Sequence, residues 1–363
     1  MKNTIGTNVA LTIFGESHGR AVGAVLDGLA PGITVDEEFI RSQLALRRSV
    51  GEISTPRKER DEFSIVSGVF EGKTTGTPIC ILIPNENTNS KDYTELKFKM
   101  RPGHADFTAF EKYHGFADYR GGGHFSGRVT AGIVAVGALA ISALRNKGIF
   151  IGTHIAKCGG ISDRDFSDFS KEINDLNNKE FAVIDNSKAE DMKKRILDAK
   201  SQGDSVGGVL QTAVVGLPAG VGEPWFDSVE GVLAHALFGI PAVKGVEFGL
   251  GFKMSDILGS QANDEFEISN GKIVTKTNNN GGINGGITNG MPLIFNTAVK
   301  PTPTISKEQN TVDIRDNTET KLIALGRHDP CIVHRARVVI DSITAIVLCD
   351  ILSGKFGIDW LAK

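Results

Sequence analysis

The stretch that decides the fold is residues 120–148, RGGGHFSGRVTAGIVAVGALAISALRNKG. Its glycine triplet, residues 121–123, allows a sharp turn and a close approach of the backbone to a ligand. From residue 129 to residue 144 the chain is apolar on every face, which predicts a helix that is buried all round. Ser126 is a candidate N-cap, and Gly148 marks the expected end of the helix.

A glycine-rich turn that leads into a helix gathers free N–H groups and the positive end of the helix dipole. Such a turn commonly binds a phosphate or a cofactor oxygen. The alternative is a tight turn that only feeds a core helix, and this stretch alone does not decide between the two.

Composition excludes several classes of protein. The chain has 363 residues and a net charge of −3, which argues against a general nucleic-acid binder. No signal-peptide pattern is present, and the apolar runs of about sixteen residues are short for a membrane span. Cys80, Cys158, Cys331 and Cys349 are scattered without zinc spacing, so we expect reduced thiols in a cytoplasmic protein.

Local patterns predict most of the regular elements. A motif at residues 68–74 resembles a nucleotide-binding P-loop, but three residues separate its glycines where four are needed, so we interpret it as a hairpin. Asn270-Gly271 is the dipeptide that a type I′ hairpin turn requires. The other expectations are strands at 22–29, 63–69, 78–84 and 151–158, a helix capped by Asp36 that runs to about Arg48, a polar and mobile insertion at 162–179, a helix opened by a capping box at 187–190 and ending at Gly203, and hairpin strands at 265–269 and 272–276. The last apolar segment, residues 337–352, is expected to be either a helix or a strand followed by a helix.

One internal similarity is visible. Residues 22–32 (VGAVLDGLAPG) resemble residues 206–220, and each stretch precedes a helix-like segment. Either the halves are a duplication or glycine- and valine-rich stretches match by chance. Because nothing between the halves is typical of a linker, we expect residues 1–363 to form a single domain.

Three histidines, His18, His104 and His124, lie in glycine-rich stretches and not on apolar faces. An imidazole in such a loop is available for proton transfer, although each could make only one ordinary hydrogen bond. No histidine pair has the i, i+4 spacing of a zinc site, so we expect no metal.

Arginines cluster near the same stretches although the chain is slightly acidic. Arg101, Arg128 and Arg327 lie inside tight loops, where guanidinium groups suit phosphate and carboxylate. The residues therefore indicate an enzyme with a basic pocket for a small, multiply anionic molecule and loop histidines for proton transfer.

Seven motifs together resemble the chorismate synthase family, in the family's order and spacing from about Thr4 to the C-terminal helix. They are residues 14–19 (FGESHG), 101–106 (RPGHAD), 118–123 (DYRGGG), 243–249 (VKGVEFG), 281–290, 300–304 (KPTPT) and 327–330 (RHDP). The resemblance implies an anti-1,4-elimination of phosphate from 5-enolpyruvylshikimate 3-phosphate, giving chorismate. It implies reduced FMN as cofactor, with NADPH or a separate flavin reductase as the source of electrons.

The resemblance also implies an α+β fold: a single-domain β-α-β sandwich with long buried helices between antiparallel sheets and an internal duplication. It implies a cytoplasmic homotetramer with no nucleic-acid or membrane partner.

Site residues follow from the resemblance by position. His18 would protonate the departing phosphate, His104 would lie by the pyrimidine edge of the flavin, and Asp329 with Ser126 would assist proton removal from the substrate through flavin N5. Flavin contacts would be His124, Phe125, Ser126, Pro241, Ala242, Gly285, Lys300, Pro301, Thr302, Pro303, Thr304 and Arg327. Substrate contacts would be Arg47, Arg48, Arg57, Arg101 and Arg128, with Arg47 also a candidate NADPH contact.

The chain departs from the family pattern at six positions. Most relatives have Arg-Ser-Ser-Ala-Arg-Glu where this chain has residues 124–129 (HFSGRV). The residues that differ from the usual ones are His124, Phe125, Gly127 and Val129. A usual arginine falls near Ile53, and a usual asparagine is Pro241. Two other functions stay open at this point: a flavin reductase, which would oxidise NADPH without substrate, and a non-enzymatic anion-binding protein, which would bind phosphate esters without turnover.

Overall fold

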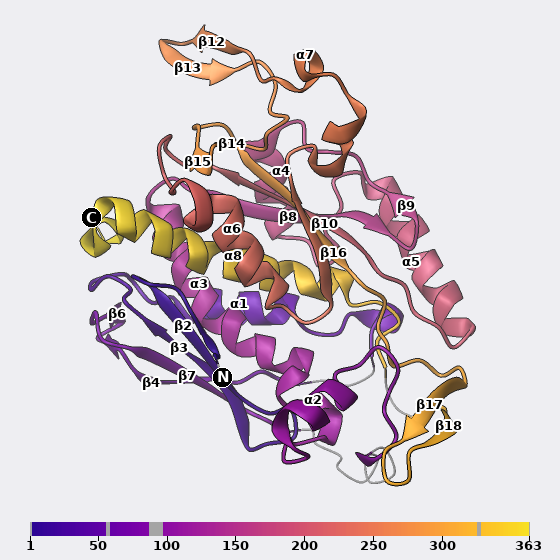
Figure 1. The fold of residues 1–363 in the computed structure, drawn as a ribbon. Coiled ribbons are helices and arrows are strands. Elements are labelled where there is room, and N and C mark those ends of the chain that lie inside the picture. Colours follow the sequence, from indigo (N-terminus) through magenta and orange to yellow (C-terminus); the bar gives the residue numbers. More distant parts are fainter. Residues whose placement is uncertain (1, 56–58, 87–96, 325–327, 363) are drawn as a thin grey trace.

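The computed structural model describes residues 2–55, 59–86, 97–324 and 328–362. Two five-stranded antiparallel sheets enclose a layer of helices, so the chain is an α+β sandwich as expected (Figure 1). The three helices that form most of this layer are α1 (Glu37–Leu46), α3 (Thr130–Asn146) and α8 (Val333–Phe356).

The first sheet has the order β1-β2-β3-β7-β4 and packs its inner face on α3. Asp36 caps α1 as expected, because its carboxylate accepts a hydrogen bond from the Phe39 N–H at 3.0 Å. The strands are β1 (Thr4–Ile5), β2 (Ala10–Gly15), β3 (Ala21–Asp27), β4 (Ser64–Ser67) and β7 (Ile79–Pro84).

The second sheet has the order β11-β16-β10-β8-β9 and is covered on both faces. In β8 the adjacent residues Gly152 and Thr153 point to opposite sides. Gly152 abuts Ile173 of α4 (Phe169–Asn177), and Thr153 donates a hydrogen bond to Asp341 of α8 at 2.6 Å. The strands are β8 (Phe150–Cys158), β9 (Ile161–Ser162), β10 (Gly208–Val215), β11 (Val243–Phe248) and β16 (Leu293–Val299).

The central helix α3 is buried on every face, as its sequence predicts. Gly132 lies against the backbone of Gly23 in β3, and Gly137 lies against Ser342 of α8, so a side chain at either position would overlap its neighbour. These two glycines let α3 approach both the sheet and α8 closely. The helical segment at residues 127–146 is long and apolar enough to cross a membrane, but 89% of an 18-residue stretch within it is buried inside the structure, as expected of a core helix.

The two halves repeat one topology. Apart from the short edge strands β1 and β9, the four strands of each sheet lie in the order first-second-fourth-third: β2-β3-β7-β4 and β8-β10-β16-β11. A short helix follows the second strand in both halves, α1 and α6 (Val229–Phe238), and a long helix ends each half, α3 and α8. The duplication expected from the sequence is therefore visible in the strand order. One continuous apolar core draws on both halves, and the single domain over residues 1–363 stays a prediction.

Two local expectations are wrong. The segment predicted as a polar, mobile insertion contains α4, which is capped by Asp168 and buries Ile173 and Leu176 against the second sheet. The predicted capping box is also displaced: α5 (Asn186–Ser201) is capped by Asp185, which accepts from the Ser187 N–H at 2.9 Å.

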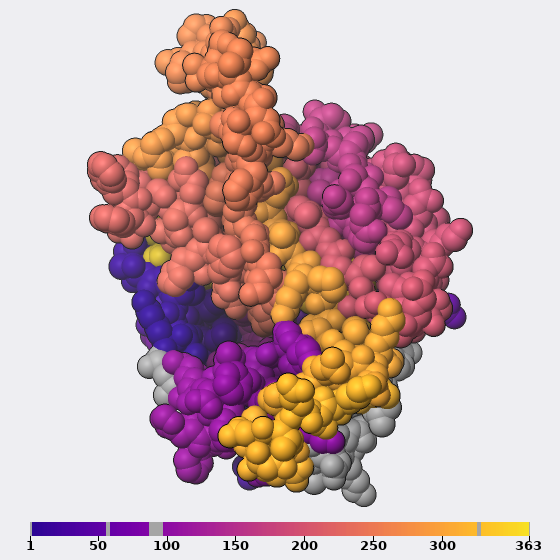
Figure 2. All heavy atoms as spheres, turned by 45° about the vertical axis from the view of Figure 1, so that its right-hand side comes forward, coloured from indigo at the N-terminus to yellow at the C-terminus, as the bar shows by residue number. Residues whose placement is uncertain are grey.

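The remaining elements are short and lie outside the two sheets. The hairpin β12–β13 turns at Asn270-Gly271 as expected, with both residues at positive φ, and it projects from the body together with α7 (Figure 2). The P-loop-like motif is the hairpin β5–β6, also as expected. Their bounds are β5 (Val69–Phe70), β6 (Lys73–Thr74), α2 (Asp106–Tyr113), α7 (Gly259–Ala262), β12 (Phe266–Ser269), β13 (Lys272–Thr275), β14 (Ile283–Asn284), β15 (Ile287–Thr288), β17 (Gln309–Asp313) and β18 (Thr318–Leu322).

Candidate active site

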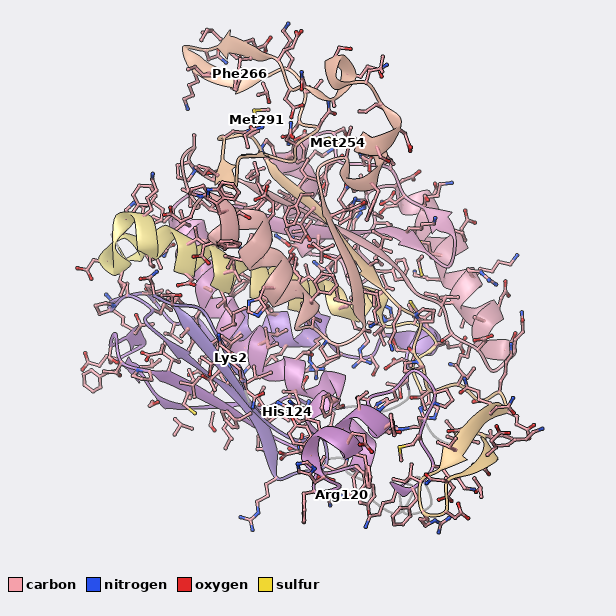
Figure 3. The ribbon with its side chains drawn as sticks, viewed as in Figure 1. Lys2, Arg120, His124, Met254, Phe266 and Met291 are labelled. Atoms are coloured by element: carbon pink, nitrogen blue, oxygen red, sulfur yellow. The ribbon has the colours of Figure 1, made fainter. Side chains whose placement is uncertain are left out.

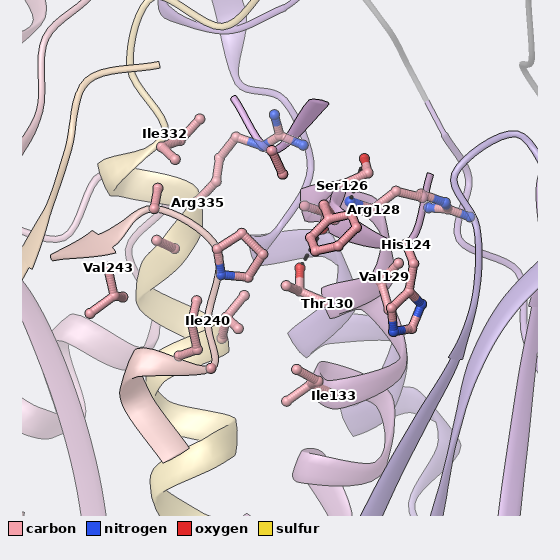
Figure 4. Close-up of a pocket in the computed structure, with 18 of the residues that line it drawn as sticks. His124, Ser126, Arg128, Val129, Thr130, Ile133, Ile240, Val243, Ile332 and Arg335 are labelled. Atoms are coloured by element: carbon pink, nitrogen blue, oxygen red, sulfur yellow. Dashed lines mark hydrogen bonds between the residues drawn. The ribbon is translucent and has the colours of Figure 1, made fainter. Parts of the chain in front are cut away.

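A cavity of about 870 Å³ lies where α3 and α8 begin (Figure 4). The start of α3 forms one wall, with Arg128 and Ile133, and the start of α8 forms the facing wall, with Ile332 and Arg335. The N-terminal ends of both long helices therefore open on one space, where their dipoles favour an anion.

The glycine triplet forms the turn that leads to α3. Gly121, Gly122 and Gly123 have φ of 62°, 98° and 52°, which only glycine adopts at little cost. A Cβ at Gly121 would overlap the His18 ring, and one at Gly123 would overlap the carbonyl oxygen of Asp118. The triplet thus lets the backbone that lines the cavity lie directly on His18.

His18 is buried behind this turn and is oriented by Ser17. Ser17 Oγ lies 3.2 Å from the carbonyl oxygen of Arg120 and 3.1 Å from His18 Nδ1. Because the carbonyl only accepts, the hydroxyl donates to it, and the imidazole Nδ1–H donates to the hydroxyl. The bond to Ser17 therefore uses Nδ1 of His18 and not Nε2.

His104 belongs to a compact triad with Arg101 and Asp106. The Asp106 carboxylate accepts from Arg101 Nε and from one terminal guanidinium nitrogen, each at 2.7 Å, and from His104 Nδ1 at 2.7 Å. Burial alone would raise the pKa of Asp106, but the bonds from Arg101 and His104 outweigh it and hold the pKa well below its usual value. The ring edge of His104 lies against Gly122.

Two cavity arginines share one buried carboxylate. Asp61 pairs with Arg128 through Oδ1 and with Arg47 through Oδ2, at 3.2 Å in the second pair. Burial alone would raise the pKa of Asp61. The positive charges of Arg47 and Arg128 outweigh this effect and lower the pKa, so the carboxylate stays ionised. Burial lowers the pKa of Arg47 to about 10, which still leaves the guanidinium charged at neutral pH. One carboxylate facing two cations leaves a net positive wall.

Asp329 is fixed at the start of α8. Its Oδ2 lies 2.6 Å from an Arg335 guanidinium nitrogen, and its Oδ1 accepts from the Thr55 N–H at 2.9 Å. Arg335 also donates through Nε to the carbonyl oxygen of Arg47 at 2.9 Å. The loop that carries Asp329 is thereby tied to the end of α1.

Most of the predicted site residues line the same cavity. His18 lies just behind its wall, and within the described residues Gly285 and Pro301 are not part of the lining. Arg57 and Arg327 lie outside the described residues, so their roles stay predictions. The predicted residues that line the cavity are Arg47, Arg48, Arg101, His104, His124, Phe125, Ser126, Arg128, Pro241, Ala242, Lys300, Thr302, Pro303, Thr304 and Asp329.

Several predicted cofactor contacts have a defined local geometry. Ala242 has a φ of 75°, which is rare for a residue with a Cβ and turns the chain sharply between α6 and β11. Lys300 donates from Nζ to the Gly103 carbonyl oxygen at 2.5 Å, which joins two cavity loops. Ser126 caps the first turn before α3 by accepting from the Arg128 N–H at 3.2 Å.

The residues that depart from the family pattern differ in how far they are buried. His124 donates from Nδ1 to the Gly15 carbonyl oxygen at 2.8 Å, so its ring is held against the first sheet (Figure 3). Phe125 is 37% exposed and packs edge-on against Tyr113. Val129 is buried, and Gly127 contributes cavity lining. Ile53 is buried in the core, where a charged side chain would have no place.

Sequence reasoning missed Asp61, Glu59, His328 and Lys2 as parts of this site. All four line the cavity, and Lys2 lies beside its first-sheet edge (Figure 3). The sequence does not single out Asp61, because Glu52, Glu59 and Glu62 lie among the arginines of the same stretch. Lys2 carries no signal either. No group of three metal-ligating side chains occurs in the part of the chain that the structure describes.

The cavity also holds polar atoms suited to a ligand. Thr302 Oγ1, Arg47 Nε and Arg48 Nε are buried and have no hydrogen-bond partner among the described residues. Buried polar atoms normally have partners, so these atoms fit a bound polar molecule. Together with the two helix N-termini, the donor set fits an anionic, hydrogen-bonding cofactor.

Comparisons with known proteins agree with this arrangement. The family model described as chorismate synthase matches residues 9–352. The chain is 46% identical over 345 residues to the chorismate synthase of Pyrococcus abyssi, covering 95% of this chain and 96% of that protein. It is 47% identical over 356 residues to that of Dehalococcoides mccartyi strain BAV1, covering 97% and 96%.

A solved structure shares the whole fold. The crystal structure of a chorismate synthase superposes with a TM-score of 0.77 at 31% identity, and the match covers 97% of this chain and 94% of that one. The buried carboxylate between two arginines, the loop histidines and the aligned sequences lead to one assignment. The chain belongs to the chorismate synthase family.

Proposed function

We propose that this chain catalyses the anti-1,4-elimination of phosphate from 5-enolpyruvylshikimate 3-phosphate, giving chorismate, with FMN as the reduced flavin. Membership of the family makes the chain a carbon–oxygen lyase of the shikimate pathway that depends on a reduced flavin. The observation that carries the proposal is the single cavity that places Arg47, Arg128 and Arg101 around one space with His104 and Asp329.

The charges of the cavity suit this substrate. The substrate carries two carboxylates and a phosphate, and FMN adds a second phosphate. Guanidinium groups bind both kinds of anion through paired hydrogen bonds. Arg47, Arg48, Arg101 and Arg128 are proposed to hold the substrate anions, with Arg57 as a further candidate. Asp61 and Asp106 keep three of these arginines in place, so that little reorganisation accompanies binding.

The catalytic residues are proposed to divide the proton transfers. His18 gives a proton from Nε2 to the departing phosphate, which leaves more readily when protonated. Asp329, fixed by Arg335 and the Thr55 N–H, lies ready to take up a proton at its carboxylate. Asp106 fixes the Nδ1–H of His104, so the Nε2 edge of this ring lies at the cavity wall beside Gly122.

The flavin pocket is proposed to form between the start of α3 and the strand end of β16. The cavity residues proposed to hold the flavin are His124, Phe125, Ser126, Pro241, Ala242, Lys300, Thr302, Pro303 and Thr304. Gly285 and Pro301, which do not line the cavity, and Arg327 are further candidates from the resemblance. When bound, the reduced flavin supplies the electron density that assists the breaking of the carbon–oxygen bond. The buried Thr302 Oγ1 and the Lys300 ammonium are the polar groups available to it.

Further features are proposed from family membership. They are a homotetrameric assembly, a cytoplasmic location, one domain over residues 1–363, and reduction of FMN either by NADPH bound near Arg47 or by a separate flavin reductase. Gel filtration with light scattering tests the assembly. NADPH oxidation by the purified chain with oxidised FMN tests which reductant route applies.

An anaerobic assay tests the proposed reaction. Purified chain, 5-enolpyruvylshikimate 3-phosphate and photoreduced FMN should yield chorismate and one phosphate per substrate. The flavin spectrum should return to the reduced form at the end, because the reaction has no net redox change. Oxidation of one flavin per phosphate released would contradict this mechanism. NADPH consumption without any chorismate formation would favour a reductase, and tight binding of phosphate esters without turnover would favour an anion-binding protein.

A further inference from the structure

Asn85, the first residue after β7, joins two parts of the site that are far apart in sequence. Its Oδ1 accepts a hydrogen bond from Arg128 Nε at 2.9 Å. Its Nδ2 donates to the carbonyl oxygens of Glu16 and Gly19, each at 2.9 Å. The amide oxygen and the NH₂ group of Asn85 are therefore both engaged in hydrogen bonds.

The three partners fix the orientation of the amide. Arg128 Nε can only donate, so it faces the amide oxygen, and the two carbonyls can only accept, so they face the NH₂ group. The flipped amide would set Nδ2 against a donor and Oδ1 against two acceptors. The side chain therefore fits one orientation only.

The two carbonyls that Asn85 holds flank the residue proposed as general acid. Glu16 and Gly19 are the ends of a tight turn, since the Gly19 N–H also donates to the Glu16 carbonyl oxygen at 3.0 Å. Ser17 and His18 are the two central residues of this turn. By clamping both ends, one amide sets where the His18 side chain leaves the backbone.

The other end of the clamp is the substrate-side arginine. Pro84, the last residue of β7, accepts from an Arg128 terminal nitrogen at 3.1 Å through its carbonyl oxygen. Two consecutive residues at the end of β7 therefore hold the Arg128 guanidinium. Because β7 lies between β3 and β4 inside the first sheet, this anchor is rigid.

We infer that Asn85 is a positioning residue for the elimination, one that fixes the His18 turn relative to the Arg128 guanidinium. The inference rests on the proposed function, in which His18 protonates the phosphate and Arg128 holds an anionic group of the same substrate. An amide bonded to both parts holds the proton donor and the anion-binding guanidinium in register before the substrate arrives.

Two substitutions at this position separate the clamp from simple stability. Asn85→Ala removes all three bonds. Asn85→Asp keeps the acceptor for Arg128 but turns a second oxygen toward the Glu16 and Gly19 carbonyls, so it breaks the turn's half of the clamp. The matched control is Asn177→Ala in α4, because Asn177 Nδ2 donates to the Ile151 carbonyl oxygen at 3.1 Å, away from the cavity.

The measurements are kcat, KM and melting temperature on the same anaerobic samples. A misplacement of about 1 Å costs about 10²-fold in rate, so kcat should fall by about that factor in both Asn85 variants. Asn177→Ala should keep kcat per folded molecule. In Asn85→Ala, which also releases Arg128, KM should rise, and binding of inorganic phosphate to the flavin-free chain should weaken.

Each outcome bears on the inference. Kcat within about threefold of wild type in either Asn85 variant overturns it. Losses of kcat that match the unfolded fraction, as in a merely structural residue, also overturn it. Absence of chorismate formation by the wild-type chain is a different result: it refutes the proposed function, whereas the phosphate-binding difference between Asn85→Ala and wild type still tests the hold on Arg128.

Discussion

His104, which lines the cavity, has its Nδ1 2.7 Å from Asp106 Oδ1. The same carboxylate accepts two bonds from the Arg101 guanidinium and one from the Arg101 backbone N–H, so a histidine and an arginine of the site depend on one acid. Asp106 is also the first residue of α2, where a carboxylate is favoured by the helix dipole. A single residue thus links the start of a helix with two groups of the cavity.

Replacing Asp106 should change how the stability of the protein depends on pH. The folded pKa of Asp106 lies below its unfolded value, so its stabilising contribution is present above about pH 4 and is lost as the pH falls below it. At pH 7 the melting temperature of Asp106→Asn should be lower than that of wild type. This difference in melting temperature should narrow as the pH falls from about 5 to about 3. Thermal melts across this range measure it. A gap that does not change with pH would show that Asp106 does not act through its charge.

His18→Ala should lower turnover by about 10²–10⁴-fold, because a general acid contributes a factor of this size. Flavin binding should change little. The matched control is His114→Asn, since His114 ends α2 at positive φ and lies away from the cavity lining. Turnover and melting temperature are to be measured on one sample. Near-normal turnover in well-folded His18→Ala would remove this residue from the mechanism and make His104 the candidate acid.

Leu139→Ala should lower the free energy of unfolding by about 2–5 kcal/mol. Leu139 is 1% exposed, and the α3 positions Val134, Val136 and Ile141, which point in other directions, are buried as well, so no face of the helix can relax toward water. Urea denaturation measures the loss. Leu258→Ala, at a position 71% exposed, should change it by about 0.5 kcal/mol or less. Similar small values for both would mean that α3 is not part of the core.

His334→Asn should flatten the stability profile between about pH 6.5 and pH 4. Burial lowers the pKa of His334 to about 4, while Nε2 bonds with Ser54 Oγ at 2.8 Å. The unfolded chain therefore binds this proton first as the pH falls, and wild-type stability drops through this window by a total of order 3 kcal/mol. Urea denaturation midpoints at pH 7 and pH 4.5 measure the fall in stability. The control variant Asp106→Asn should show the same fall as wild type. An unchanged slope in His334→Asn would assign the drop to other groups.

Features that depend on neighbouring residues in sequence were predictable. The all-apolar run before Gly148 is buried because no face of such a helix can meet water without cost, and Asn270-Gly271 forms its hairpin because both residues accept positive φ. The missed helix α4 is different. Its polar residues outnumber its apolar ones, and only the packing of Ile173 and Leu176 on a distant sheet makes it stable.

The residues of the site also fall into those that the sequence reveals and those that it does not. Loop histidines and arginines are recognisable because their glycine-rich surroundings are local. Asp61 and Asn85 carry no local signal, because their meaning comes from Arg128, which reaches them only when the turn before α3 meets the end of β7. Pairing across more than forty residues of sequence is a property of the folded chain, and a single sequence does not contain it.

The repeated strand order has a consequence for how such a chain could arise and be taken apart. In each half, a sheet covers one side of a long helix, and the other side of that helix is covered by its counterpart from the other half, as Gly137 against Ser342 shows. An ancestral half-length polypeptide would therefore have needed a second copy of itself, paired by a two-fold axis, to leave no apolar helix face in water. Today's chain, cut between α3 and β8, should yield two fragments that are insoluble alone and reassemble when mixed.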